Sequence, residues 1–490
     1  MLANFPAAAY HGLAPAAWHW LGAITAGLAA APGPESRGHA DPVAPILIAL
    51  VLIAFGAMLG GHLVRKLGQP AVLGELLVGM LVANAAYYLH EPVITILREG
   101  ETARAILHAA MTRSISLAEA ARHLLPATAH TERLIEILNS SSGAVAILVY
   151  EFVDNLSRIA IVILLFLVGL ETSVRELRKV GWTSFFVALL GIVCPFLLGV
   201  GGMRLLAPDS PLNVALFVGV ILVATSVGIT ARIFRDLQQE HRPEAKIILS
   251  AAVMDDVLGL LFLAILSGYI DSGTVNFGAI SLITVKAVAF LAGSIGIGVW
   301  VTPRLVRRMA RLEIRNLKLL FGLGIAFVFA WIASKMGLAT IIGAFAAGLA
   351  LEEFFFQELK EEHSLRHLLS PLESLIVPVF FVLMGMQVKL ETFGDWRVVV
   401  IAGVITAAAV AGKVLSGLAC TSPLSRLAVG VGMMPRGEVA LIFASVGKGL
   451  GVISEGIFSA VVIMVMVTTL LTPPLLRFAL LTPGRTKLNA

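Results

Sequence analysis

The stretch Ser250-Ala-Ala-Val-Met-Asp-Asp-Val-Leu-Gly259 places two adjacent carboxylates, Asp255 and Asp256, in an apolar run from about Ile247 to Ile270. At about 1.5 Å rise per residue, this run is long enough to cross a bilayer as a helix. A carboxylate near the bilayer midplane costs at least a few kcal/mol, so an acid at that depth indicates an ion or proton path. A single buried Asp could simply hold helices together, but two in a row favour the functional interpretation.

A lysine in a second apolar run is the candidate partner of one of these acids. Neighbouring helix positions point about 100° apart, so Asp255 and Asp256 face different surroundings and each needs its own compensation. Lys413 lies among small residues in the run 407–417, where an ammonium is as costly as a carboxylate unless it is paired. Counted from the flanking basic residues, Asp256 and Lys413 lie at similar depth, so contact is allowed. Alternatively, Lys413 could snorkel to the interface.

Length and composition indicate a polytopic membrane protein. The chain has 490 residues, of which 58% are hydrophobic and 14% charged, and its mean hydropathy is +0.92. The net charge of +5 is better explained by loop arginines facing the cytosol than by binding to nucleic acid. Cys194 and Cys420 lie in or at the end of apolar runs, and they imply neither a disulfide framework nor a metal site.

Thirteen apolar runs from Val43 onward predict an all-α fold with about 13 transmembrane helices. The runs cover residues 43–64, 71–90, 156–171, 181–205, 211–233, 245–270, 277–302, 317–337, 338–354, 371–388, 397–420, 425–447 and 452–476. Lys and Arg number 21 in alternate loops and the C-terminal tail, against five in the opposite short loops. This asymmetry predicts an N-terminus outside and a C-terminus in the cytosol.

The chain is expected to divide into a membrane domain with smaller segments at and between its helices. Residues 43–480 form the membrane domain, and residues 91–155 within it are expected to be an external helical insertion. Residues 1–42 are interpreted as a signal-like segment or an N-terminal extension, and residues 481–490 as a cytosolic tail. The basic connector 304–315 is expected to bind anionic lipid headgroups, or only to set the topology.

The fifth and twelfth runs are interrupted by glycine and polar residues. The fifth reads Ala224-Thr-Ser-Val-Gly-Ile-Thr-Ala-Arg232, and the twelfth reads Gly430-Val-Gly-Met-Met-Pro-Arg-Gly-Glu438. With the seventh run as a linker, each interruption falls in the fifth run of its half, which indicates an inverted-repeat transporter. Unwound backbone at that depth presents carbonyls and half-helix ends to an ion.

Four polar residues of these interruptions are candidate site residues. Thr225 and Ser226 could supply neutral oxygen ligands, or their hydroxyls could bond back to their own helix. Arg436 and Glu438 are expected to neutralise the opposed half-helix ends and each other. The alternative is that this pair consists of ordinary loop charges near the cytosolic end.

Together these motifs resemble the bacterial sodium/proton antiporters of the monovalent cation:proton antiporter-2 family, over about residues 43–480. The resemblance is carried by 224–232, Asp255-Asp256, Ala411-Gly-Lys413, Pro378-Val-Phe-Phe-Val-Leu-Met-Gly385 and Pro435-Arg-Gly-Glu438. It implies a core domain with two crossed broken helices, a dimerisation domain, and a homodimer that works by elevator-like motion. It also implies that Asp256 binds the cation and the proton, that Asp255 partners Lys413, and that Thr225 and Ser226 are accessory ligands.

We therefore expect a secondary active antiporter of the bacterial inner membrane rather than an enzyme. It would exchange Na⁺ or Li⁺ for H⁺, serve pH homeostasis, and need no cofactor. Exchange is expected to be electrogenic, because a cation at Asp256 would displace one proton there and disturb the Asp255–Lys413 pair, so that Lys413 releases a second proton.

Two alternatives remain at this point. K⁺/H⁺ exchange is the nearer one, although the potassium efflux systems that resemble this fold usually carry a cytosolic nucleotide-binding domain. An intramembrane aspartyl protease is distant, because its two acids must converge from separate helices.

Overall fold

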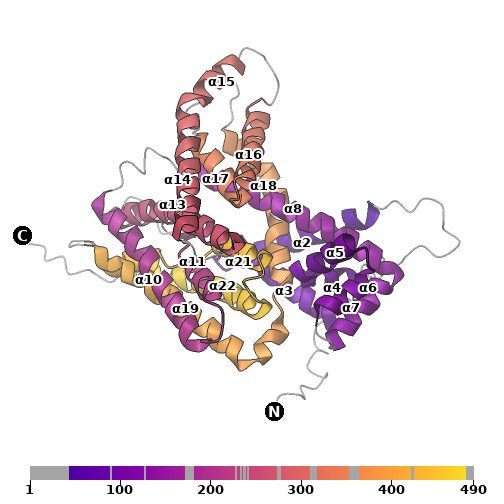
Figure 1. Cartoon of the computed structure of the whole chain (residues 1–490). Helices are drawn as coiled ribbons and strands as arrows, with labels where there is room; N and C mark the ends of the chain where they lie inside the picture. The colour runs from indigo at the N-terminus through magenta and orange to yellow at the C-terminus, as the bar shows by residue number, and fades with distance from the viewer. Residues whose placement is uncertain are drawn as a thin grey trace, which may run out of the picture.

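The computed structural model describes residues 43–88, 91–125, 129–171, 181–226, 229–231, 234, 239, 242–272, 277–309, 317–351, 364–420 and 424–481. Every regular element within these ranges is helical (Figure 1). The predicted all-α fold is therefore confirmed. The expectations for residues 1–42 and for the tail beyond residue 481, and half of the connector that is expected to bind lipid (310–315), lie outside the described residues.

The apolar runs of the sequence correspond to a series of helices. They are α2 (Ala44–Lys66), α3 (Ala71–Tyr88), α8 (Ser141–Glu171), α10 (Trp182–Leu206), α11 (Leu212–Ile221), α13 (Pro243–Ser272), α14 (Phe277–Trp300), α16 (Leu317–Lys335), α17 (Thr340–Ala350), α18 (Leu365–Met386), α19 (Trp396–Ser416), α20 (Arg426–Gly432), α21 (Glu438–Gly449) and α22 (Glu455–Leu481). Short elements between them are α15 (Thr302–Met309), η4 (Leu390–Gly394) and η5 (Gly417–Ala419). Eight stretches, in α2, α8, α10, α13, α16, α18, α19 and α22, are long and apolar enough to cross a membrane.

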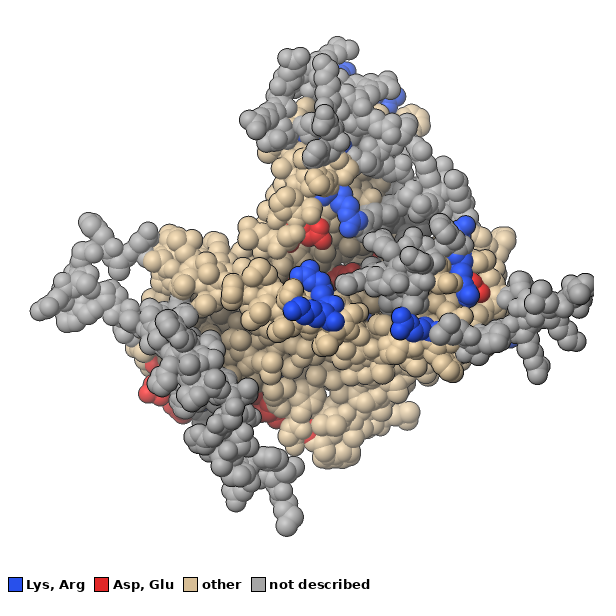
Figure 2. Space-filling model, turned by 180° about the vertical axis from the view of Figure 1, so that it is seen from behind, with Lys and Arg blue, Asp and Glu red and all other residues tan. Residues whose placement is uncertain are grey.

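The outward faces of these helices are apolar. On α2, for example, Leu47, Val51, Phe55 and Met58 are all exposed. Figure 2 shows one face of the molecule on which uncharged surface predominates. An exposed stripe of this kind would be unfavourable in water and is favourable against lipid tails. The chain is thus a multi-pass membrane protein.

Helix contacts divide the membrane domain into two groups. The first group comprises α2, α3, α8, α16, α17 and α18, and the second comprises α10, α11, α13, α19, α20, α21 and α22. Each helix packs extensively on others of its own group, whereas the extensive contacts between groups in the described chain run through α14, which packs on α13 and on α17. Such a division would allow one group to move relative to the other.

Two reciprocal glycine contacts support the inverted repeat within the first group. Gly79 of α3 meets Gly385 of α18, and Gly169 of α8 meets Gly348 of α17. In both pairs, a Cβ on either glycine would collide with the backbone oxygen three residues before the other glycine. The second helix of each half therefore makes the same contact with the third helix of the other half, as repeats related by a two-fold axis require.

The insertion is helical, as expected, but shorter than predicted. Its helices are α4 (Pro92–Glu99), α5 (Glu101–Arg113), α6 (Leu117–Leu124) and α7 (Ala129–Asn139). The predicted boundary at residue 155 is wrong, because α8 already begins at Ser141. Charged residues in the first half of α8 lower the local hydropathy, but Asp154 is paired: it accepts a bond of 3.1 Å from Arg158 and forms an ion pair with Arg104.

Candidate functional site

The two predicted interruptions lie against each other in the second helix group. After α11 the backbone is non-helical at residues 224–226, and between α20 and α21 it is non-helical at residues 434–437. The Ser226 amide donates to the carbonyl of Pro435 at 2.9 Å, and Thr230 Oγ1 donates to the carbonyl of Gly432 at 2.7 Å. Because the segments satisfy each other's backbone groups, unwound chain can exist at this depth.

Asp255 is paired inside the crossing, the region where the interruptions 224–226 and 434–437 lie against each other. Its Oδ2 accepts from Lys413 Nζ at 2.5 Å and from Thr225 Oγ1 at 2.9 Å. Asp255 and Lys413 are each 0% exposed, and Thr225 is 1% exposed. The structure thus brings α13, α19 and the first interruption together at one carboxylate, which balances the buried charge of Lys413. The contact that the resemblance implied between Asp255 and Lys413 is present.

Asp256, the next residue on α13, lies in a different environment. It is 4% exposed, and its charged neighbours are Glu438, Asp255 and Lys413. Its Oδ1 accepts no hydrogen bond from the described residues. A buried carboxylate with spare acceptor capacity and acidic neighbours is suited to hold a proton or a small cation.

The charges at the crossing do not cancel. The charged groups that act on the two aspartates are Lys413, Arg436 and Glu438. Counted in their ionised forms, the three carboxyl groups carry one more charge than the two cationic side chains, an excess of one negative charge. Because an uncompensated charge at membrane depth is costly, the site favours one proton or one monovalent cation.

Arg436 and Glu438 do not pair with each other in the described structure, contrary to expectation. The buried guanidinium of Arg436 donates to the carbonyls of Ala224 at 2.7 Å and Ala409 at 3.2 Å. Glu438 is the first residue of α21 and accepts a 3.4 Å bond from Ser226 Oγ. The guanidinium lies just beyond the C-terminal end of α11 and the carboxylate at the N-terminus of α21, and both positions suit the helix dipoles.

Two further hydroxyl groups, which were not predicted as site residues, help to hold the crossing together. Thr230 joins the two interruptions, and Thr469 Oγ1 donates to the carbonyl of Arg436 at 2.6 Å. Thr230 stands in the quoted motif of the fifth run. Thr469 belongs to a group of three threonines within the last apolar run. Such a cluster in a membrane helix could have indicated a hydrogen bond to a neighbouring segment.

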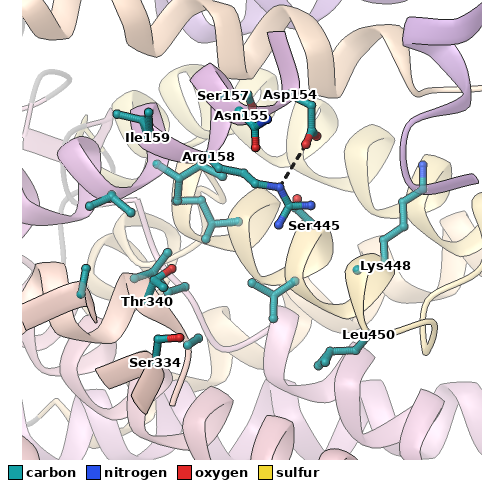
Figure 3. Close-up of a pocket in the computed structure, with 18 of the residues that line it drawn as sticks. Asp154, Asn155, Ser157, Arg158, Ile159, Ser334, Thr340, Ser445, Lys448 and Leu450 are labelled. Atoms are coloured by element: carbon teal, nitrogen blue, oxygen red, sulfur yellow. Dashed lines mark hydrogen bonds and ion pairs between the residues drawn. The ribbon is translucent and has the colours of Figure 1, made fainter. Parts of the chain in front are cut away.

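A separate cavity of about 940 Å³ lies between the two helix groups. Figure 3 shows Asp154, Asn155 and Arg158 reaching it from α8, while Ser445 and Lys448 reach it from α21. Asp255 and Asp256 are not among the residues that line it. The cavity therefore borders the other end of α21, the helix that begins at the crossing with Glu438.

Comparison with known proteins decides between the possible families. Residues 48–481 match the family described as "Sodium/hydrogen exchanger, transmembrane". The chain belongs to this family. The predicted resemblance is thereby confirmed, and membership of a transporter family rules out the aspartyl protease alternative. In this family the transported ions are substrates, and no cofactor is needed.

Individual exchangers of the family are similar over most of the chain. The high-affinity Na⁺/H⁺ antiporter NhaS3 of Synechocystis is 35% identical over 442 residues, which cover 89% of this chain and 90% of that protein. The probable Na⁺/H⁺ antiporter GerT of Bacillus cereus is 32% identical, covering 87% and 97%. The structure of the sodium proton antiporter MjNhaP1 from Methanocaldococcus jannaschii, 17% identical, matches with a TM-score of 0.56 over 91% of this chain and 100% of that chain. This structural likeness shows that the fold is shared.

Proposed function

We propose that this protein exchanges Na⁺ for H⁺, with Asp256 as the carboxylate that binds either ion. The observation that carries the proposal is the excess of one negative charge at the crossing, which either a proton or a monovalent cation would balance. Because one carboxylate serves both, binding of one ion expels the other, and exchange follows when the site opens to alternate sides. The names of the similar antiporters support sodium as the cation.

The neighbouring residues would assist this exchange. Thr225 and Ser226 lie in the first interruption, where their hydroxyls and carbonyls could complete the coordination of Na⁺ or Li⁺. Thr225 bonds to Asp255 and Ser226 to Glu438, so each ligand is also tied to a charged group of the site. Arg436 would hold the two interruptions together through its bond to Ala224.

We further infer that exchange is electrogenic. A cation at Asp256 would disturb the Asp255–Lys413 pair, and Lys413, left without its counter-ion in a buried site, would release a second proton. Net charge would then cross the membrane with each cycle. At about 2.3 kcal/mol per charge per 100 mV, the membrane potential would drive sodium extrusion.

The placement in the membrane is proposed from the distribution of basic residues, and the assembly from the resemblance to the family. The protein would lie in the bacterial inner membrane with its N-terminus outside and its C-terminus in the cytosol, as the 21 to five distribution of Lys and Arg in the loops favours. It would act as a homodimer in which the second helix group moves past the first. The basic connector after α14 would contact anionic lipid headgroups.

Exchange in proteoliposomes tests the function. Purified protein is reconstituted, a proton gradient is imposed, and Na⁺, Li⁺ or K⁺ is added while internal pH is followed. The proposal predicts dissipation of the gradient by Na⁺ and Li⁺. Dissipation by K⁺ alone would support the potassium alternative, and no response to any cation would contradict the proposal.

The charge movement needs a second assay. The membrane potential is clamped at either sign with potassium and valinomycin, while uptake of radioactive sodium is followed. Electrogenic exchange predicts uptake rates that depend on the sign of the potential. Rates that are indifferent to the sign would leave an electroneutral exchanger in which Lys413 is only structural.

A further inference from the structure

The first helix of the insertion, α4, ends in two buried charges. All of α4 from Val93 to Glu99 is buried, and its last two residues, Arg98 and Glu99, are 0% and 1% exposed. Buried charges at the end of a short helix require partners on neighbouring elements. These partners therefore show what the insertion is attached to.

Both partners lie in the segment that follows α18. Glu99 accepts a 2.9 Å bond from Lys389 Nζ. Arg98 forms an ion pair with Glu391, donates to Asn84 Oδ1 at 3.0 Å, and lies 4.2 Å from the centre of a tyrosine ring of α3. The adjacent charges of α4 are thus matched by opposite charges two residues apart after α18.

The chain of charges continues into the second helix group. Glu455, at the start of α22, lies 3.8 Å from Lys389 and 3.0 Å from Lys448 of α21. Lys448 Nζ also donates to Gln387 Oε1 at 3.1 Å. One connected set of polar groups therefore joins α4 and the segment after α18 to α21 and α22.

This set divides into two halves that are each neutral. Glu99 of α4 and Lys389 after α18 form one ion pair beside the first group, and Lys448 and Glu455 form another within the second group. Three polar links run between the halves: the 3.8 Å contact of Lys389 with Glu455, the bond of Lys448 to Gln387, and a 3.3 Å bond that the Lys389 amide donates to Ser459 Oγ of α22. Breaking these links leaves every lysine with a carboxylate, so it avoids the large penalty of stranding a buried charge.

The position of α21 connects this set with the ion site. The helix begins at Glu438, beside the crossing, and reaches Lys448 ten residues later, about 15 Å along its axis. Gln387 and Lys448 also line the cavity between the groups, and Figure 3 shows Lys448 extending from the far end of α21. A movement of the crossing relative to the first group must therefore change the distance from Lys448 to Gln387.

We propose that α4 and the segment 387–391 form an ionic latch on α21 and α22. The latch is closed in this structure, and its inter-group links open whenever the second group moves. The insertion takes part in the latch because it supplies Glu99, which holds Lys389 in place when the latch is open. The inference rests on the proposed antiport function, because it assigns the latch to the movement that exchange requires.

Reversible cross-linking tests the latch. The double variant Gln387→Cys/Lys448→Cys is prepared with Cys194 and Cys420 replaced by alanine, so that no other thiol competes. A short bifunctional methanethiosulfonate reagent joins the introduced thiols across the two groups. The matched control, Lys448→Cys/Glu455→Cys in the same background, joins α21 to α22 within one group. Each variant is assayed before cross-linking, after it, and after reduction.

The latch predicts that joining residues 387 and 448 lowers Na⁺-driven proton exchange to the level of protein-free liposomes and that reduction restores it. Joining residues 448 and 455 should leave exchange unchanged. Exchange that persists after complete linkage of 387 to 448 would overturn the proposal, and so would equal loss in the control variant. The antiport function is judged separately, from exchange by the unmodified protein.

Discussion

The crossing and the latch are both clusters of buried charge, but they balance their charges differently. At the crossing, three carboxyl groups face two cationic side chains. In the latch, three acidic side chains face three basic ones, namely Glu99, Glu391 and Glu455 against Arg98, Lys389 and Lys448. A neutral cluster needs nothing from solution, whereas the crossing favours a cation or proton. The comparison teaches that the charge balance, rather than burial, separates a transport site from a structural one.

The clusters also differ in their access to water. Asp255 and Asp256 are at most 4% exposed, while the side chains of Glu391 and Glu455 in the latch are 42% and 28% exposed. Salt screens exposed charges much more than buried ones. Raising the ionic strength should therefore weaken the latch while the Asp255–Lys413 pair remains intact.

The largest effect is expected from Asp256→Asn. The substitution removes the excess negative charge at the crossing, so it should abolish Na⁺/H⁺ exchange in proteoliposomes. Asp154→Asn is the matched control, because Asp154 lies in α8 between Arg104 and Arg158, and this variant should retain measurable exchange. More than a few per cent of wild-type exchange in Asp256→Asn would refute the assignment of the carboxylate.

Removing one partner of the buried pair should have the next largest effect. Lys413→Met leaves Asp255 without its cation, which should lower the free energy of unfolding by about 3–5 kcal/mol. Adding Asp255→Asn to Lys413→Met should recover most of that loss, because no buried charge is then stranded. Thermal unfolding in detergent, monitored by tryptophan fluorescence, measures both. A double variant that is no more stable than Lys413→Met would show that the pair is not a closed unit.

The smallest effect is expected from Glu391→Gln in the latch. Arg98 keeps its bond to Asn84 and its ring contact, and the amide oxygen of the introduced glutamine can still accept from the guanidinium, so the cost should be smaller than that of Lys413→Met. The measurement is the same thermal unfolding, repeated at high salt, where the difference from wild type should shrink. A loss as large as that of Lys413→Met would erase the distinction between the two clusters.

The sequence predicted what depends on local pattern. The apolar runs predicted the helices, and the glycines together with Thr225, Ser226 and Pro435 predicted the two interruptions. Because the acid pair and Lys413 lie at similar depths along their helices, contact between them could be expected. The start of α8 was missed because hydropathy counts Glu151 and Asp154 as polar, although Asp154 is paired with Arg104 and Arg158.

Contacts between distant segments could not be predicted in this way. Arg436 donates to Ala224, 212 positions away, and Glu99 meets Lys389 across 290 positions. No local pattern specifies such pairings, because they depend on how the two helix groups are placed in space. For this reason the partner of Arg436 was assigned wrongly to Glu438, and the latch was not anticipated.

The most direct test of the account is to count protons when sodium binds. Na⁺ is added to purified protein in weakly buffered detergent solution, and the released protons are measured with a pH dye, while bound radioactive sodium is counted in parallel. Because Asp256 holds either ion, sodium binding should release protons from the wild type and none from Asp256→Asn. Sodium bound without proton release, or the same release from Asp256→Asn, would contradict competition at this carboxylate.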